Sequence, residues 1–295
     1  IKEDRKMKDY FGYQGQIAVV TGAASGMGKA TTEMLVDLGA KVYALDWQKV
    51  EVDGIEKYIH VDLSQKESID QAFQEIPDHI HAFFGIAGVS GAKNDFITTC
   101  KIDLLSNQYI CEEYLIHRMQ KGDAIAFMTS TGGNGWERED NKDIYLPVIQ
   151  ASGWDGKVAA IEKTGMSRMP GTMAYPFSKL AMNYLTVYLQ STFASQGIRV
   201  NAVLPGSTDT GMKDEFTQMA GGEEALLSHC GYAKHLATSE EMAMPIVFLN
   251  SVMASYISGE HLIVDFSQTS EEIAGIKPVG QVISLKGILE YMKNM

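Results

Sequence analysis

The chain has 295 residues, and 45% of them are apolar, enough for a sizeable core. Its 25 basic and 37 acidic residues give a formal net charge of −12, which argues against nucleic acid or an anionic membrane as the main partner. Three scattered cysteines exclude a disulfide framework. No apolar run approaches the ~20 residues that span a bilayer, and the charged N-terminal segment lacks a signal-peptide core, so we expect a cytoplasmic protein.

Short apolar runs alternate with longer amphipathic segments from residue 16 onward. Strands are predicted at residues 17–22, 41–46, 57–63, 81–88, 123–130, 198–206 and 261–266. Helices are predicted at residues 29–40, 68–76, 100–120 and 176–197. Apolar strands separated by helices indicate βαβ units, and therefore an α/β fold: one doubly wound parallel sheet (Rossmann) with helices on both faces. Because no linker or repeat interrupts the pattern, we expect a single domain over residues 1–295.

Two segments interrupt this pattern. Residues 133–172 form a long insertion between the fifth strand and the next helix, with a helix predicted over residues 146–165 despite Gly153 and Gly156. Residues 268–295 form a C-terminal tail that ends in an amphipathic stretch. Either segment could be surface decoration, an oligomer contact or a cover for the substrate.

A glycine-rich stretch, VTGAASGMGKA, follows the first predicted strand and opens the first helix. Gly22, Gly26 and Gly28 permit a tight turn and a close approach of a pyrophosphate to a helix N-terminus, which favours anions. An ordinary loop between strand and helix is the alternative. Asp46 ends the second strand, where a carboxylate can bind two ribose hydroxyls and repel a 2′-phosphate. NAD(H) is therefore favoured over NADP(H), unless Asp46 is merely solvated.

Asp62 follows the third predicted strand in the sequence VDLS. Its carboxylate could accept a hydrogen bond from an adenine amine, or it could cap the following helix together with Ser64. The sequence leaves both alternatives open.

Tyr175 and Lys179 stand four residues apart at the start of a predicted helix, so their side chains share one face. Pro176 fits a first helical turn, where its missing N–H is not needed. A pair with this spacing is common and usually lies on a surface. Ser130 ends the fifth predicted strand, upstream of the pair.

Several motifs follow one another in a characteristic order: TGAASGMG, Asp46, VDL, GIAG, TSTGG, YPFSK and NAVLPGSTDT. From residue 17 to about residue 265 the chain thereby resembles the short-chain dehydrogenase/reductase family. The resemblance implies that Tyr175 is the general acid or base, and that Ser130 binds the substrate oxygen. Lys179 would hold the nicotinamide ribose and, with the NAD⁺ ring, lower the tyrosine pKa from about 10 to ~7, which requires about 4 kcal/mol.

The same resemblance implies a set of cofactor-binding residues along the carboxyl edge of the sheet. They are Gly22, Ser25, Gly26, Met27, Gly28, Asp46, Trp47, Asp62, Leu63, Ala87, Gly88, Tyr175, Lys179, Pro205, Gly206, Thr208 and Thr210. Among them, the Thr208 backbone and the Thr210 hydroxyl are expected at the nicotinamide carboxamide. Gly88 would let the cofactor lie close to the fourth strand.

The chain departs from the family pattern at two places. Gly85 and Ile86 replace two asparagines that usually stabilise the central sheet, which we expect to alter packing more than activity. Asp103 aligns with an asparagine that supports a water chain to the lysine, although Asn107 is the other candidate. A carboxylate there would raise the lysine pKa and partly neutralise its field at the tyrosine, so Asp103 joins the candidate catalytic residues.

The interval from Ser130 to Tyr175 is longer than is usual in the family. In this feature the chain resembles the 3α-hydroxysteroid dehydrogenase/carbonyl reductase subgroup. This implies an NAD(H)-dependent oxidoreductase that interconverts a secondary alcohol and a ketone, with a hydroxysteroid as the first expectation. A small cyclic, aromatic or polyol alcohol is the alternative substrate. A non-catalytic NAD(H)-sensing protein and a non-redox lyase are the alternative functions.

Residues 207–240 would form a substrate lid. The nearby methionines, Met212, Met219, Met242 and Met244, could adapt to flat apolar ligands or belong to the core. No metal is expected, because the histidines and cysteines lack metal-ligand spacing. The family usually forms homodimers or homotetramers, and we expect one of these here.

Overall fold

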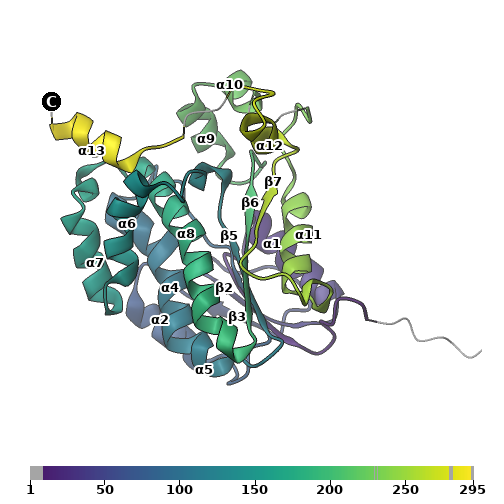
Figure 1. Ribbon diagram of the computed structural model, residues 1–295. Coiled ribbons are helices and arrows are strands. Elements are labelled where there is room, and N and C mark those ends of the chain that lie inside the picture. Colours follow the sequence, from purple (N-terminus) through teal and green to yellow (C-terminus); the bar gives the residue numbers. More distant parts are fainter. Residues whose placement is uncertain (1–8, 229, 231, 279–281, 294–295) are drawn as a thin grey trace, which may run out of the picture.

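Seven parallel strands form the central sheet of the computed structural model, which describes residues 9–228, 230, 232–278 and 282–293 (Figure 1). Their spatial order is β3-β2-β1-β4-β5-β6-β7. The strands are β1 (Ile17–Thr21), β2 (Lys41–Asp46), β3 (Lys57–His60), β4 (Ala82–Gly85), β5 (Ala124–Met128), β6 (Arg199–Pro205) and β7 (His261–Val264). The order reverses between β1 and β4, where doubly wound sheets open a crevice for ligands. The predicted doubly wound fold is confirmed.

The apolar runs of the sequence form the inner strands of the sheet, which are buried on both faces. Every residue of β4, β5 and β6 is buried, whereas β7 at the edge is half-buried. Strands β3 and β4 end earlier than predicted, at His60 and Gly85. Residues 61–63 and 86–88 are therefore free to form loops at the carboxyl edge of the sheet.

Helices cover both faces of the sheet (Figure 1). α1 (Gly26–Asp37) and α11 (Ser239–Asn250) lie on one face, where their apolar side chains join a core cluster with β1 and β2. α2 (Lys66–Gln74) and α8 (Gly171–Phe193) lie on the other face and share the second, larger cluster. The carboxyl edge, which neither layer of helices covers, is left for a site.

The helix predicted over residues 100–120 is interrupted by two wider turns. α3 (Phe96–Cys100), α4 (Ser106–Ile110) and α5 (Ile116–Arg118) are joined by π-helical turns at Lys101–Leu105 and Cys111–Leu115. Such turns are frequent at functional sites. The first of them carries Asp103.

The insertion contains two helices where one was predicted. α6 (Glu139–Gln150) and α7 (Gly153–Lys163) are separated by a break at residues 151–152, and Gly153 has a φ of 66°, a conformation that favours glycine. α8 begins at Gly171, earlier than predicted, so Pro176 lies inside the helix. Its assignment to the first turn is therefore wrong.

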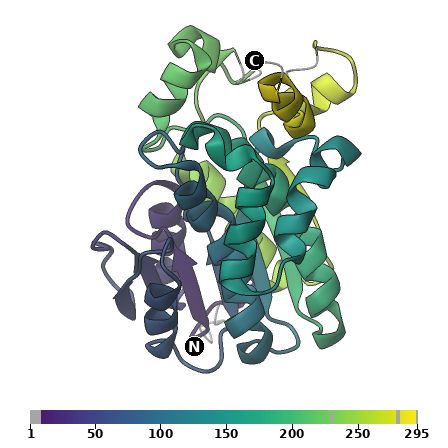
Figure 2. The same ribbon diagram turned by 90° about the vertical axis from the view of Figure 1, so that its left-hand side faces the viewer.

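Short helices stand beyond the carboxyl edge of the sheet (Figures 1 and 2). α9 (Lys213–Ala220) and α10 (Glu223–Leu227) belong to the predicted lid, and α12 (Gln268–Ile273) belongs to the tail. Residues 229 and 231 of the predicted lid, and 279–281 and 294–295 of the predicted tail, lie outside the described residues, as do residues 1–8.

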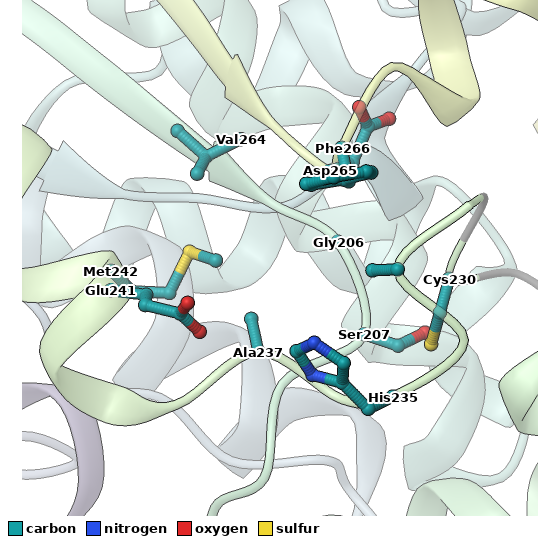
Figure 3. Close-up of a pocket in the computed structure, with 11 residues that line it drawn as sticks. Gly206, Ser207, Cys230, His235, Ala237, Glu241, Met242, Val264, Asp265 and Phe266 are labelled. Carbon is teal, nitrogen blue, oxygen red and sulfur yellow. The ribbon is translucent and has the colours of Figure 1, made fainter.

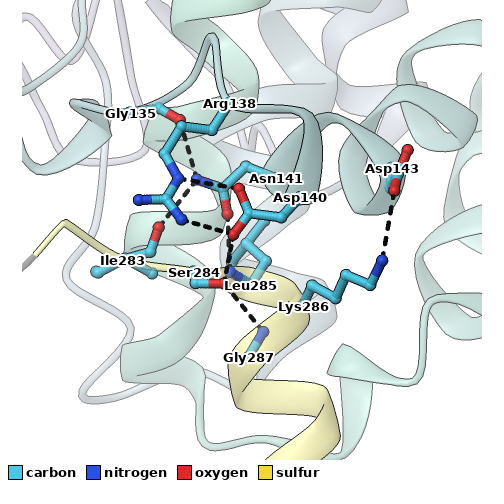
Figure 4. A network of polar contacts seen from close by, with 10 residues as sticks. All are labelled: Gly135, Arg138, Asp140, Asn141, Asp143, Ile283, Ser284, Leu285, Lys286 and Gly287. Atoms are coloured by element: carbon cyan, nitrogen blue, oxygen red, sulfur yellow. Dashed lines mark hydrogen bonds and ion pairs between the residues drawn. The ribbon is translucent and has the colours of Figure 1, made fainter.

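The tail ends in α13 (Leu285–Lys293), which packs beside α6 (Figures 1 and 4). Asn141, a fully buried residue of α6, accepts a hydrogen bond from Leu285 N at 2.8 Å. Its amide nitrogen donates to the carbonyl oxygens of Gly135 at 3.0 Å and Ile283 at 2.9 Å. One asparagine thus joins the insertion, the tail and the loop that follows Ser130.

Candidate active site

The glycine loop connects β1 to α1 in a tight turn. Gly22 has a φ of 73°, and a Cβ atom there would lie 2.8 Å from Ala87 Cα. A Cβ atom at Gly28 would lie 2.0 Å from Gly22 O. Neither position has room for a side chain, because the loop folds against itself and against the residues after β4. The motif therefore has the strand–turn–helix setting of a dinucleotide site.

The N-terminus of α1 is available to an anion. Ser25 is the N-cap residue, and its side chain forms no capping hydrogen bond with the described residues. The first turn of α1 carries no acidic side chain. Free N–H groups and the helix dipole together favour a phosphate at this position. Gly26 and Met27 open this turn, so the predicted loop residues fit a pyrophosphate.

Asp46 is buried at the end of β2 and supports the glycine loop. Its Oδ2 atom accepts a hydrogen bond from Ala24 N at 3.0 Å, and its Oδ1 atom accepts one from Gln48 N at 2.8 Å. Each carboxylate oxygen has a further lone pair, so Asp46 can hold the loop and still accept from ribose hydroxyls. The neighbouring Trp47 is 69% exposed.

Asp62 and Leu63 lie in the loop after β3. Asp62 Oδ1 accepts hydrogen bonds from Ser64 N at 2.9 Å and from Ser64 Oγ at 2.7 Å. α2 begins only at Lys66, with Gln65 as its N-cap residue. Asp62 therefore forms a local turn and does not cap α2, while its contact with adenine stays a prediction.

Ser130 and Tyr175 come from different elements and meet at Gly132. The Ser130 hydroxyl oxygen accepts a hydrogen bond from Gly132 N at 2.9 Å. A Cβ atom at Gly132 would lie 3.2 Å from Ser130 Oγ and 3.6 Å from Tyr175 Cε1. A Cβ atom at Gly133 would lie only 2.5 Å from Lys179 O. The loop after β5 thus packs directly against α8, which brings the serine hydroxyl beside the tyrosine ring.

Lys179 is buried one helical turn after Tyr175, with its ammonium group close to the site. Its Nζ atom donates a hydrogen bond to Met128 O at 3.2 Å and lies 5.4 Å from the centre of the Tyr175 ring. A Cβ atom at Gly88 would lie 3.6 Å from this nitrogen. A Cβ atom at position 88 would therefore be in ordinary van der Waals contact with the lysine, so Gly88 lies directly beside Lys179 Nζ.

Asp103 lies on another side of Gly88 and is 1% exposed. A Cβ atom at Gly88 would lie 3.6 Å from Asp103 Oδ1, which accepts a hydrogen bond from Val89 N at 2.8 Å. The other carboxylate oxygen is buried and has no hydrogen-bond partner among the described residues. Within that same set, Asp103 and Lys179 form no ion pair. Asp103 thus lies next to Gly88, as Lys179 does, and its part in a proton relay stays a prediction.

Asn107, the alternative candidate, has a different place. A Cβ atom at Gly85 would lie 2.4 Å from Asn107 Oδ1 and 2.7 Å from Phe127 Cδ1. The Asn107 amide therefore occupies the space that a side chain at position 85 would need. This explains how the sheet accommodates a glycine where the family usually has an asparagine.

The protein's own groups raise the pKa of Tyr175, whereas the expected fall in this pKa also involves the NAD⁺ ring. Burial raises the pKa of Tyr175 to about 12; a hydrogen bond with Ser130 opposes this rise, and the Asp103 charge adds to it. Burial also lowers the pKa of Lys179, against the influence of Asp103. Desolvation of the phenolate sets the direction of the Tyr175 shift, and Lys179 is not among its causes.

Burial raises the pKa of Asp103 to about 6, while Lys179 and the hydrogen bond from Val89 act in the opposite direction. The carboxyl is thus a buried group that changes its charge near neutral pH, beside the candidate catalytic lysine. Perturbed groups of this kind cluster at functional sites.

The loop after β6 reaches the glycine loop. A Cβ atom at Gly26 would lie 3.6 Å from Thr210 Cβ. Thr208 Oγ1 donates a hydrogen bond to Gly206 O at 3.0 Å, just after Pro205 at the end of β6. The predicted nicotinamide-side residues therefore lie at the same edge as the predicted pyrophosphate-side residues.

A cavity adjoins Gly206 between the loop after β6, α11 and the end of β7 (Figure 3). Its lining residues are Gly206, Ser207, Cys230, Ala233, His235, Ala237, Glu241, Met242, Val264, Asp265 and Phe266. Tyr175 and Asp46 do not line it. Met242 is buried in the core, whereas Met219 and Met244 are 47% and 52% exposed.

Sequence reasoning missed one side chain that touches the candidate site. The Phe216 ring, from α9, packs edge-on against the Tyr175 ring with centroids 5.2 Å apart and planes at 66°. The amphipathic lid segment was the only available signal, because nothing in the residue spacing links positions 175 and 216.

The comparisons with known proteins agree with this geometry. The family described as short chain dehydrogenase matches residues 16–138, and the family described as enoyl-(acyl carrier protein) reductase matches residues 144–266. A coniferyl-alcohol dehydrogenase from a Pseudomonas species is 26% identical and aligns with 84% of this chain and 94% of its own length. The 3-oxoacyl-[acyl-carrier-protein] reductase FabG of Thermotoga maritima is 27% identical, with 85% and 97% covered.

A solved structure has the same fold. The 3-alpha-hydroxysteroid dehydrogenase from Pseudomonas sp. B-0831, complexed with NADH, superimposes with a TM-score of 0.73 at 21% identity, over 89% of this chain and 99% of that one. Together with the two family matches, which follow one another along most of the chain, this fold defines the class. The chain belongs to the short-chain dehydrogenase/reductase family of oxidoreductases.

No helix within the described residues is both long and apolar enough to cross a membrane. In the same part of the chain, no group of three or more His, Cys, Asp or Glu side chains is arranged to hold a metal ion.

Proposed function

We propose that this protein is an NAD(H)-dependent oxidoreductase that interconverts a secondary alcohol and a ketone. The observation that carries the proposal is the meeting of Ser130 Oγ and the Tyr175 ring at Gly132, with the Lys179 ammonium beneath the ring. NAD(H), when bound, supplies or accepts the hydride. Residues 1–295 act in this proposal as one dinucleotide-binding and catalytic domain.

The dinucleotide would be held by the glycine loop and by Asp46. The uncapped N-terminus of α1 suits the pyrophosphate. The Asp46 carboxylate suits two ribose hydroxyls and disfavours a 2′-phosphate, which supports NAD(H) over NADP(H). Lys179 and the loop after β6 would hold the nicotinamide end.

Tyr175 would transfer the proton to or from the substrate oxygen, with Ser130 donating a hydrogen bond to that oxygen. With a pKa of about 12 in the protein on its own, the phenol is protonated at neutral pH. The phenolate is the base in oxidation and the product of proton donation in reduction, and at pH 7 its formation would cost about 7 kcal/mol from that pKa. A positive charge brought close to the ring would therefore assist both directions.

A hydroxysteroid is the first candidate substrate. The long insertion and the fold of the 3-alpha-hydroxysteroid dehydrogenase support it, as does the apolar Phe216 ring at Tyr175. A smaller aromatic alcohol is the second candidate, because a relative that aligns along most of the chain is a coniferyl-alcohol dehydrogenase. We further propose that the protein is cytoplasmic and forms a homodimer or homotetramer, because members of the family usually form such oligomers.

The decisive experiment compares Tyr175→Phe with the parent protein in NADH formation and consumption, using steroid, aromatic and simple secondary alcohols and their ketones. We expect turnover to fall by about 100-fold or more, because general acid–base groups contribute at this scale. NADH binding, measured by fluorescence, should be retained. Tyr188→Phe, on the exposed side of the same helix, is the matched control.

A variant that turned over substrate as fast as the parent would overturn the role of Tyr175. Tight NADH binding with no turnover of any substrate by the parent protein would instead favour the NAD(H)-sensing alternative.

A further inference from the structure

The lid helix α9 is tied to the loop that follows β4. Glu215, in the first turn of α9, accepts a hydrogen bond from Ser90 Oγ and forms an ion pair with Lys93 Nζ at 2.7 Å. Ser90 is 2% exposed and also accepts a hydrogen bond from Ala92 N at 3.2 Å. Lys93 and Ser90 together hold the pKa of Glu215 below its usual range. One carboxylate thus joins two segments 125 positions apart in the sequence.

The loop that receives Glu215 is itself fixed to the start of α8. A Cβ atom at Gly91 would lie 2.0 Å from Gly171 O, and one at Gly171 would lie 1.8 Å from Asn94 O. These two backbones are in direct contact, with no space for side chains between them. Because α8 carries Tyr175, the loop gives α9 an anchor that is rigid relative to the tyrosine.

Phe216, the residue after Glu215, is the lid side chain that packs against the Tyr175 ring. Its contact and the Glu215 tie therefore come from neighbouring positions of the same helical turn. The contacts of Lys213 on the same turn, with Asp209 Oδ2 at 3.4 Å and Thr210 O at 2.9 Å, stay within the lid segment, whereas Glu215 ties the turn to the loop after β4.

We propose that Glu215 is a positioning residue that latches α9 over the candidate site, and that the latched Phe216 ring determines specificity by forming the apolar wall beside Tyr175. This inference rests on the proposed function for its specificity part. An apolar ring beside the reacting oxygen favours the binding of substrates whose carbon skeleton is bulky and apolar. It contributes little binding free energy for small polar alcohols.

The two partners of Glu215 contribute unequally. Lys93 is 84% exposed, and ion pairs of exposed side chains contribute little. The Ser90 hydroxyl is buried, so its charge-assisted hydrogen bond is the stronger tie. Glu215→Ala should therefore release α9 most, Glu215→Gln should partly restore the tie, and Lys93→Ala should have the smallest effect.

The first test is hydrogen–deuterium exchange of the purified protein without substrate. In Glu215→Ala we expect the amides of α9 to exchange roughly tenfold faster, the scale of one lost charge-assisted hydrogen bond, while the amides of α8 keep the parent rate. Asp214→Ala removes an exposed carboxylate from the same turn and is the matched control, expected to match the parent. Equal exchange of α9 in Glu215→Ala and Asp214→Ala would overturn the latch.

The second test compares KM and kcat for a steroid ketone and for a small ketone such as cyclohexanone. Glu215→Ala and Phe216→Ala should each raise the KM for the steroid, relative to the KM for cyclohexanone, about fivefold or more. Glu215→Gln should recover part of the loss. Faster exchange of α9 with an unchanged ratio of the two KM values would overturn the specificity role and leave the latch.

The exchange measurement needs no turnover, so its outcome is separate from the fate of the proposed function. A parent protein that turned over neither ketone would count against the proposed function and the specificity role, while the latch would still stand or fall on the exchange of α9.

Discussion

Replacing Asp103 by asparagine should stabilise the protein in a pH-dependent way. Asparagine keeps the oxygen that accepts the hydrogen bond from Val89 and removes the charge. The pKa of Asp103 is raised from 3.8 to about 6, chiefly by burial, so the folded protein disfavours the ionised carboxylate. At ~1.36 kcal/mol per unit, this difference amounts to about 3 kcal/mol of lost stability once the group is ionised.

The sign follows from proton linkage. Between about pH 4 and pH 6 the folded state holds a proton on Asp103 that the unfolded state has released, so stability falls as the pH rises through this window. Below the window the parent carries no penalty from Asp103, and above it the penalty is complete. Asp103→Asn should therefore match the parent near pH 4 and exceed it by about 3 kcal/mol at pH 7.5.

Urea denaturation followed by circular dichroism at both pH values measures the difference directly, and the change between pH values cancels effects of the substitution that do not depend on pH. Asp123→Asn is a poor control because Asp123 bonds His79; Asp214→Asn, an exposed carboxylate, is the suitable one. Equal stability gains at pH 4 and pH 7.5, or a loss at pH 7.5, would show that Asp103 is not an ionised, desolvated group in the folded protein.

Three further substitutions test other parts of the structure. Gly85→Ala should lower the free energy of unfolding by about 1–3 kcal/mol, measured by urea denaturation, because its Cβ atom would meet Asn107 at 2.4 Å. Asp46→Asn should raise the affinity for NADP⁺ relative to NAD⁺ about tenfold, measured by fluorescence titration, because it removes the repulsion of a 2′-phosphate. Asn141→Ala should cost about 2–4 kcal/mol and speed proteolytic release of the tail, because it leaves buried backbone groups without partners.

The sheet and the glycine loop were predictable because local patterns encode them. Continuous apolar runs specify inner parallel strands, and the order of elements leaves few topologies. The same local reasoning placed Pro176 wrongly, since α8 begins at Gly171, where its backbone contacts the loop after β4, and Pro176 therefore lies inside the helix. The insertion was predicted as one helix because neither Gly153 nor Gly156 alone specifies where a helix breaks.

The electrostatics of the site could not be predicted from spacing. The interval from Tyr175 to Lys179 places both on one helical face, but the tyrosine pKa depends on how deeply the phenol is buried and on Asp103, which comes from another helix. The contacts of Glu215 could not be predicted from the sequence either. Its partners, Ser90 and Lys93, lie in the loop after β4, and no sequence pattern connects them to α9.

Two positions at which the chain differs from the family pattern, Gly85 and Asp103, both contact the side chain of Asn107. Asn107 fills the space left by Gly85 and also lies within hydrogen-bonding distance of Asp103 O, at 3.4 Å from its amide nitrogen. Asp103 O belongs to the π-helical turn that directs the Asp103 carboxylate to Val89, next to Gly88. The glycine at position 85 therefore leaves space for Asn107, and Asn107 contacts the turn that carries Asp103, whose pKa is raised to about 6 beside the candidate catalytic lysine.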